Sequence, residues 1–91
     1  MSRQYAKVKE WVVNKAQDIA SGYNVFIDVE SRDEKTGATK ADENGYLTVV
    51  VEEVLNETEK AVQVILASGS VVGSCKGWKT WIPKSQIQFA E

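Results

Sequence analysis

The sequence predicts an α+β fold with an N-terminal amphipathic helix and about five short antiparallel strands in a small curved sheet or partly open barrel. Three observations predict it. Apolar residues recur at helical spacing over the first twenty positions, the spacing changes to alternation after residue 23, and turn residues then interrupt the chain at short intervals. Strands that follow a single helix favour an antiparallel sheet, which protects its edges best by closing. The length of 91 residues predicts a single domain, 1–91.

The helix is predicted over residues 3–20. Apolar residues follow one another there at steps of three or four, which places one stripe on a helix: Tyr5, Val8, Val12, Ala16, Ile19 and Tyr23. Trp11 lies at the edge of this stripe, and polar residues fill the opposite face. Gly22 is predicted to end the helix with a positive φ.

The β-rich part is predicted over residues 23–90. Val25, Ile27 and Val29 point one way in its first strand, while the other face carries Phe26, Asp28 and Glu30. The stretch 32–45 contains no apolar residue larger than alanine, and it predicts a long flexible connection or a hairpin tip. Asn44 and Gly45 predict a tight turn that starts the next strand.

Further strands follow at short intervals. Residues 46–55 carry valine at three successive positions, so both faces of that strand are predicted to be covered. Residues 60–67 alternate as another strand, and a Gly/Ser-rich reversal over 68–77 comes next. Residues 78–82 form a strand that Pro83 ends, because proline donates no N–H to a ladder. A last short strand passes through Ile87 and Phe89.

The closing segment GWKTWIPKSQI resembles the end of Src-homology-3-type barrels. That family closes with a strand, a proline in a single helical turn and a last strand carrying Val or Ile; the matching positions are 81–83, the turn Lys84-Ser85, and Ile87. The resemblance implies that Ile82 enters the core and that Ile87 returns beside the first strand. The acidic aromatic stretch with which these domains bind proline-rich peptides is not recognisable, so the resemblance implies an architecture.

A second resemblance concerns the origin of the chain. The stretches ETEKAVQV and KTWIPKSQI are similar to short uncharacterised proteins of phages and prokaryotic mobile elements. A lone cysteine, Cys75, cannot form an internal disulfide, and the N-terminus lacks an apolar signal core. No apolar run is long enough to span a membrane. We therefore expect a cytoplasmic protein, in the host cytoplasm if a phage encodes it.

Composition argues against an enzyme and against a metal or cofactor site. The chain has no histidine and one cysteine, which excludes structural zinc in practice. The acidic stretch 33–45 lacks the ligand spacing of a calcium loop, and the glycines of 68–77 lack the Lys-Ser/Thr ending of a phosphate loop. We expect no catalytic residues, no metal and no cofactor.

Charge is segregated along the chain, although the net charge is only −2. Residues 28–59 hold ten acids and three bases, whereas both ends are basic. An acidic face that binds a protein partner is the first candidate site, and it comprises Asp28, Glu30, Asp33, Glu34, Asp42 and Glu43. A solvated loop and strand rim is the plainer interpretation of the same residues.

The C-terminal strand is the second candidate site. Its aromatic and basic residues are typical of surfaces that bind single-stranded nucleic acid, and they are Lys76, Trp78, Lys79, Trp81 and Lys84. Alternation predicts that Trp78 points inward with Ile82, while Trp81 points outward near Lys79. Trp81 packed under the N-terminal helix, against Tyr5 or Val8, is the structural alternative.

The expected function is that of a non-enzymatic binding module. A protein partner is the first expectation, with inhibition of a host nucleic-acid-handling or defence enzyme as one form of it. Single-stranded nucleic-acid binding is the alternative, and a homodimer through a sheet edge is the second alternative. No association with a membrane is expected.

Overall fold

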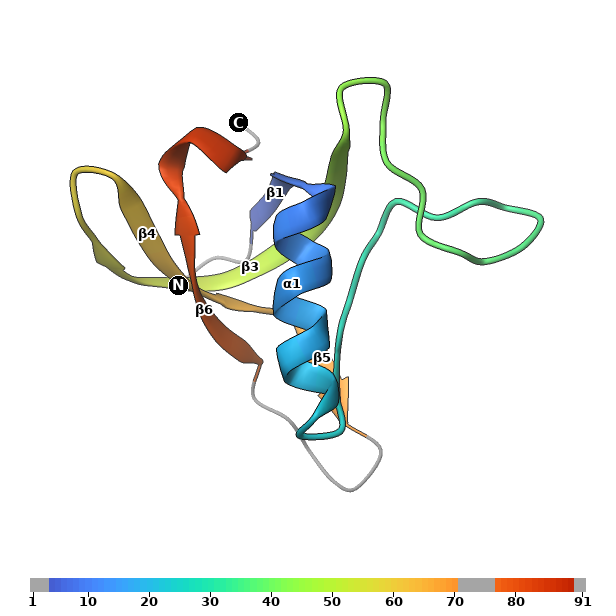
Figure 1. Ribbon diagram of the computed structural model, residues 1–91, viewed down its shortest axis with the longest axis horizontal. Coiled ribbons are helices and arrows are strands. Elements are labelled where there is room, and N and C mark those ends of the chain that lie inside the picture. The colour runs from blue at the N-terminus through green and yellow to red at the C-terminus, as the bar shows by residue number, and fades with distance from the viewer. Residues whose placement is uncertain (1–3, 71–76, 90–91) are drawn as a thin grey trace.

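The computed structural model describes residues 4–70 and 77–89, and it has an α+β fold (Figure 1). One helix, α1 (Glu10–Ser21), accompanies a five-stranded antiparallel sheet in the order β6-β4-β3-β1-β7. A separate ladder joins β2 and β5. The strands are β1 (Gln4–Lys9), β2 (Val25–Ile27), β3 (Tyr46–Glu57), β4 (Ala61–Leu66), β5 (Ser68–Ser70), β6 (Trp78–Pro83) and β7 (Ile87–Phe89).

The first third of the predicted helix is wrong, because residues 4–9 form the strand β1. Ala6 and Val8 are completely buried there, opposite Val49 and Leu47 of β3. On its other side β1 pairs with β7, so it is an interior strand whose backbone is satisfied by two ladders. The helix begins at Glu10, after an N-cap lysine that makes no side-chain capping bond.

The buried face of α1 differs from the predicted stripe. It consists of Val12, Val13, Ala16 and Ala20. Ile19, predicted in the core, is 55% exposed because the helix turns its Val13 side toward the sheet. Gly22 follows the last residue of the helix as predicted, but the predicted positive φ is wrong, because its φ is −64°. Asn24 takes the left-handed conformation instead, which asparagine tolerates better than most residues.

The strand predicted after residue 23 has the predicted buried and exposed residues, but it is shorter than predicted. Val25, Ile27 and Val29 are buried, while the alternating residues Phe26, Asp28 and Glu30 are exposed. Regular pairing covers only β2, and Val29 then forms a single bridge with Val49. The connection 32–45 contains one bridge, and the tight turn at Gly45, with φ of +84°, leads into β3 as predicted.

The centre of the core lies along β3 and β4. All three successive valines of β3 are buried, which confirms that both of its faces are covered. β4 turns Val62, Val64 and Leu66 inward. At Ala67 the chain passes from the large sheet to the small ladder, because the Ala67 N–H donates to the Val50 carbonyl and its own carbonyl accepts from Asp28.

The C-terminal segment has the predicted order of strand, turn and strand. Ile82 is buried opposite Val62, and η1 (Lys84–Gln86) is a 3₁₀ turn that follows Pro83. Ile87 then lies beside Val8, so its neighbour is β1 and not the strand predicted at residues 25–30. Among the described strands, β6 and β7 are the two edges of the sheet, and the sheet does not close into a barrel. The Src-homology-3-type resemblance stays a prediction.

Candidate binding groove between α1 and β6

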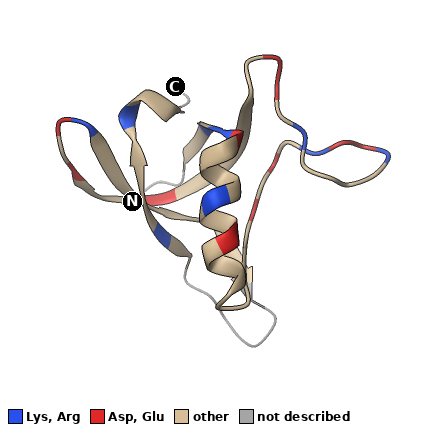
Figure 2. Ribbon diagram, in the orientation of Figure 1, with Lys and Arg blue, Asp and Glu red and all other residues tan. Residues whose placement is uncertain are grey.

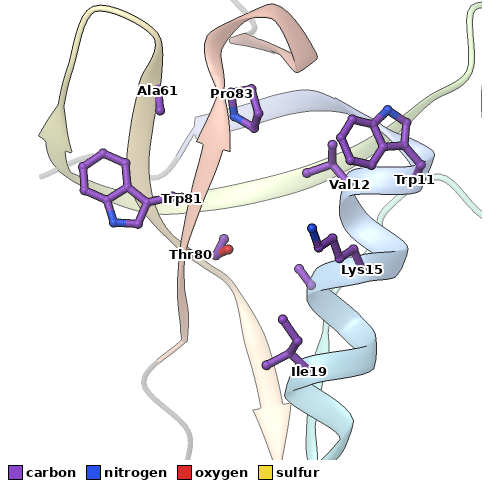
Figure 3. Close-up of a pocket in the computed structure, with 9 residues that line it drawn as sticks. Trp11, Val12, Lys15, Ile19, Ala61, Thr80, Trp81 and Pro83 are labelled. Atoms are coloured by element: carbon purple, nitrogen blue, oxygen red, sulfur yellow. The ribbon is translucent and has the colours of Figure 1, made fainter.

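A groove of about 400 Å³ lies between α1 and β6 (Figure 3). The helix supplies one wall with Trp11, Val12, Lys15, Ala16 and Ile19. The sheet supplies the other with Ala61, Thr80, Trp81 and Pro83. A volume of this size is in the range of cavities that receive small ligands or the side chains of a partner.

The groove exists because the helix presents large side chains beside small ones. Trp11, Lys15 and Ile19 are spaced four residues apart and so form one exposed stripe of α1. Ala16 follows next to that stripe, and Thr80 faces it from β6, so little fills the space between the elements. Trp11 and Ile19 are 56% and 55% exposed as a consequence.

Two contacts bound the groove. At one end the rings of Tyr23 and Trp78 lie 5.8 Å apart, tilted by 42°. At the other end the Trp11 indole N–H donates a hydrogen bond of 3.3 Å to the Gln86 side-chain oxygen in η1. The helix is therefore tied to the C-terminal segment on both sides of the hollow.

Among the described residues, Lys15 is the only charged one that lines the groove. In Figure 3 its side chain extends from α1 toward β6. Ion pairs among the described residues join Lys7 to Asp42 and Lys84 to Glu57, and neither uses Lys15. The ammonium group is thus available to a negatively charged group in the groove.

The structure divides the tryptophans of β6 between its two sides. Trp78 is half-buried and packs against the core, whereas Trp81 is 47% exposed beside the exposed Lys79. In Figure 3 the Trp81 ring extends away from α1, so it does not pack under the helix. Lys84 is engaged by Glu57, and Lys76 lies outside the described residues, as does Cys75.

The predicted acidic face is spread along the connection between β2 and β3. Asp28 and Glu30 are exposed on its first part, and Glu34 and Glu43 on its turns. Arg32, Lys35 and Lys40 alternate with the acids, as the blue and red segments of Figure 2 show. The connection lies on the opposite side of α1 from β6 (Figure 1), so the two candidate sites are separate surfaces.

Two of these acids serve the loop itself. Asp33 Oδ1 accepts the backbone N–H groups of Lys35 and Thr36. Asp42 Oδ1 accepts those of Asn44 and Tyr46, and Asp42 Oδ2 lies 3.6 Å from the Lys7 ammonium. The N–H of Tyr46, followed by that of Asn44 and the charge of Lys7, holds the pKa of the Asp42 carboxyl below its ordinary value, although desolvation opposes the shift.

Other classes of site are not visible in the described part of the chain. Residues 4–70 and 77–89 contain no cluster of metal-ligating side chains. None of their helices is long and apolar enough to cross a membrane. Comparisons with protein-family models, curated proteins and solved structures found no match.

Sequence reasoning missed the groove because it assigned Val12, Ala16 and Ile19 to the core, Trp11 to the edge of their stripe and Lys15 to the opposite face. Trp11, Lys15 and Ile19 share one side of the helix at regular spacing, which was the available signal. A lysine between two apolar residues on one side of a helix indicates that this side is exposed to solvent or contacts a partner. The opposite wall comes from β6, more than fifty residues later in the chain.

Proposed function

We propose that this protein is a binding module whose α1–β6 groove receives an apolar segment of a protein partner. The observation that carries the proposal is that Trp11 and Ile19, each about half exposed, lie on the helical wall of one hollow whose other wall is β6. Exposed aromatic and aliphatic groups around a hollow are the usual receptors for the anchoring side chains of a partner. Apolar surface of this kind gains free energy when a partner removes it from water.

The lining also indicates the charge of the partner segment. Lys15 is the one cation among apolar walls, and it has no acidic partner in the described residues. Closing the groove over an unpaired ammonium group costs free energy, which a carboxylate of the partner would offset. The segment that fits therefore carries an apolar residue and an acidic residue close together.

The proposal is tested with a display library of random short peptides, selected on the wild-type protein. Peptides that bind are then measured on Ile19→Asp, which places a negative charge on the groove wall. The matched control is Asn14→Asp, which adds the same charge to an exposed helical position outside the groove lining. We expect Ile19→Asp to weaken binding at least about tenfold and the control to leave it unchanged. Equal affinities for the two variants would refute the groove as the binding site.

Single-stranded nucleic acid is the second candidate, favoured by Trp81 and Lys79. Both are exposed, and their positions on β6 place them on the same side of the strand. An exposed indole with a neighbouring lysine stacks a base and contacts a phosphate. A short oligothymidylate should then quench tryptophan fluorescence at low salt, with affinity falling as salt rises. Absence of quenching at low salt eliminates this candidate.

The remaining expectations from sequence stay predictions. They are the lack of enzymatic activity, the phage or mobile-element source, the inhibition of a host enzyme, the homodimer, and the acidic face as a partner surface. The groove is favoured over the acidic face because Asp33 and Asp42 are already engaged within their own loop.

A further inference from the structure

The wall that β6 contributes to the groove is an edge of the sheet. β6 stands at one end of the strand order and pairs only with β4 in the described part of the chain. An edge strand has unpaired backbone N–H and C=O groups that another chain is able to complete.

A single hydrogen bond identifies the residues of β6 whose backbone groups face the outer edge. The Lys84 N–H donates to the Lys60 carbonyl at 2.8 Å, and the register from that pair along β6 and β4 has no shift. In an antiparallel ladder, hydrogen-bonded pairs recur at every second residue. Trp78, Thr80 and Ile82 therefore exchange bonds with β4. Lys79 and Trp81 turn their N–H and C=O groups to the outer edge, beside the groove.

Pro83 limits the length of this edge. It is the next residue in the outward-facing series, and it has no N–H to offer. The outer edge thus provides two complete residues, Lys79 and Trp81, which suits a short segment better than a long strand. A lysine and a proline on an edge also discourage open-ended association between copies of a chain.

We infer that β6 binds the partner segment as an added strand, paired to the backbone of Lys79 and Trp81. This inference rests on the proposed function and names its binding mode. In an added strand, side chains alternate between the two faces. Those on the Thr80 side enter the groove toward Lys15 and Ile19, and those on the other side lie against the exposed face of Trp81.

The spacing of the helix defines the class of segment further. Residues two apart on a strand are separated by about 7 Å, close to the rise of about 6 Å between helical residues four apart, as Lys15 and Ile19 are. An apolar residue facing Ile19 and an acidic residue facing Lys15 therefore fit two positions apart on one extended segment. The expected ligand is an extended peptide with an apolar and an acidic residue at positions i and i+2.

Amide hydrogen exchange followed by NMR tests this pairing directly. In the free protein the amides of Lys79 and Trp81 should exchange as exposed amides do, whereas those of Thr80 and Ile82 should be protected. A library peptide whose affinity depends on Ile19 should protect Lys79 and Trp81 as well. Lys79→Pro, which removes an outward N–H, should weaken that peptide at least about tenfold more than Lys79→Ala does.

The outcomes separate this inference from the proposed function. A peptide that needs Ile19 but leaves both amides unprotected overturns the pairing and leaves the groove as the site. If no peptide depends on Ile19, both proposals fall. If both amides are protected without peptide, and this protection grows with protein concentration, the added strand comes from a second copy of the protein. That result would overturn the inference that a partner segment pairs with β6.

Discussion

The ring of Tyr23 lies 5.8 Å from the ring of Trp78, and this contact joins the turn after α1 to the start of β6. It engages one tryptophan of the C-terminal strand in the fold. The other, Trp81, stays on the surface three residues later, with Trp11 also exposed across the groove. The three tryptophans thus have distinct roles, and each can be examined by itself.

Quenching by acrylamide should distinguish the tryptophans. We expect a variant that keeps only Trp78 to be quenched less steeply than variants that keep only Trp11 or only Trp81. The reason is that Trp78 is partly buried against the core, whereas the other two are about half exposed. Phenylalanine replaces the two removed tryptophans in each variant, so the aromatic content is matched. A Trp78-only variant that is quenched as steeply as the others would contradict the division of the indoles across β6.

The closing strand should depend on Ile82 for stability. Ile82 is 1% exposed, so Ile82→Ala should lower the free energy of unfolding by about 2–5 kcal/mol through lost burial and the resulting cavity. The control is Ile19→Ala, the same chemical change at a position that is 55% exposed, and it should cost less than about 1 kcal/mol. Urea unfolding measures both. Similar losses for the two variants would argue against the orientation of β6.

The position directly before β6 should tolerate only glycine. Gly77 has a φ of +104°, and a Cβ there would meet Ile65 Cγ2 at 2.3 Å. Gly77→Ala should therefore destabilise the protein by about 1–3 kcal/mol. Gly69→Ala is the matched control, because a Cβ at Gly69 meets nothing within 4 Å and its φ is not in the left-handed region. Thermal unfolding that shifts equally in both variants would contradict the conformation at Gly77.

The Asp42 carboxyl should titrate below its ordinary pKa of 3.8. Because the folded-state pKa is lowered, the stability that this group contributes is fully present above pH 3.8 and is lost as the pH falls through the folded-state value. Lys7→Gln should move the pKa only part of the way back, since the Tyr46 N–H is the larger cause. An NMR titration of the carboxyl carbon gives the value. A result at or above 3.8 would mean that the loop bonds are not formed in solution.

Local patterns predicted the strands better than the helix. The alternation of Val25, Ile27 and Val29 defined a buried face that the structure confirms, because a strand with one buried face admits only one register. The three successive valines of β3 correctly indicated a strand covered on both faces. Residues 4–9 also alternate, with Ala6 and Val8 between lysines and Tyr5, yet helical spacing beyond them concealed it. Pairing with two distant strands decided their conformation, and no local pattern records that.

The groove could not be predicted from either of its walls alone. Ile19 fits a buried stripe equally well when α1 is considered without the sheet. Its exposure follows from the angle at which α1 meets the sheet, which depends on contacts such as Tyr23 with Trp78 across more than fifty residues. The outward orientation of Trp81 was predictable because it needs only the alternation of one strand and the buried Ile82.

Chemical-shift mapping of the tryptophan indole N–H groups tests the groove most directly. A library peptide whose binding depends on Ile19 is titrated into isotopically labelled protein, and the three indole signals are followed together with the backbone amides. The indole signals of Trp11 and Trp81 should move, and that of Trp78 should stay in place. Shifts confined to the amides of residues 28–43, with both exposed indole signals unchanged, would contradict the groove as the binding site. They would favour the acidic connection as the surface that binds the peptide.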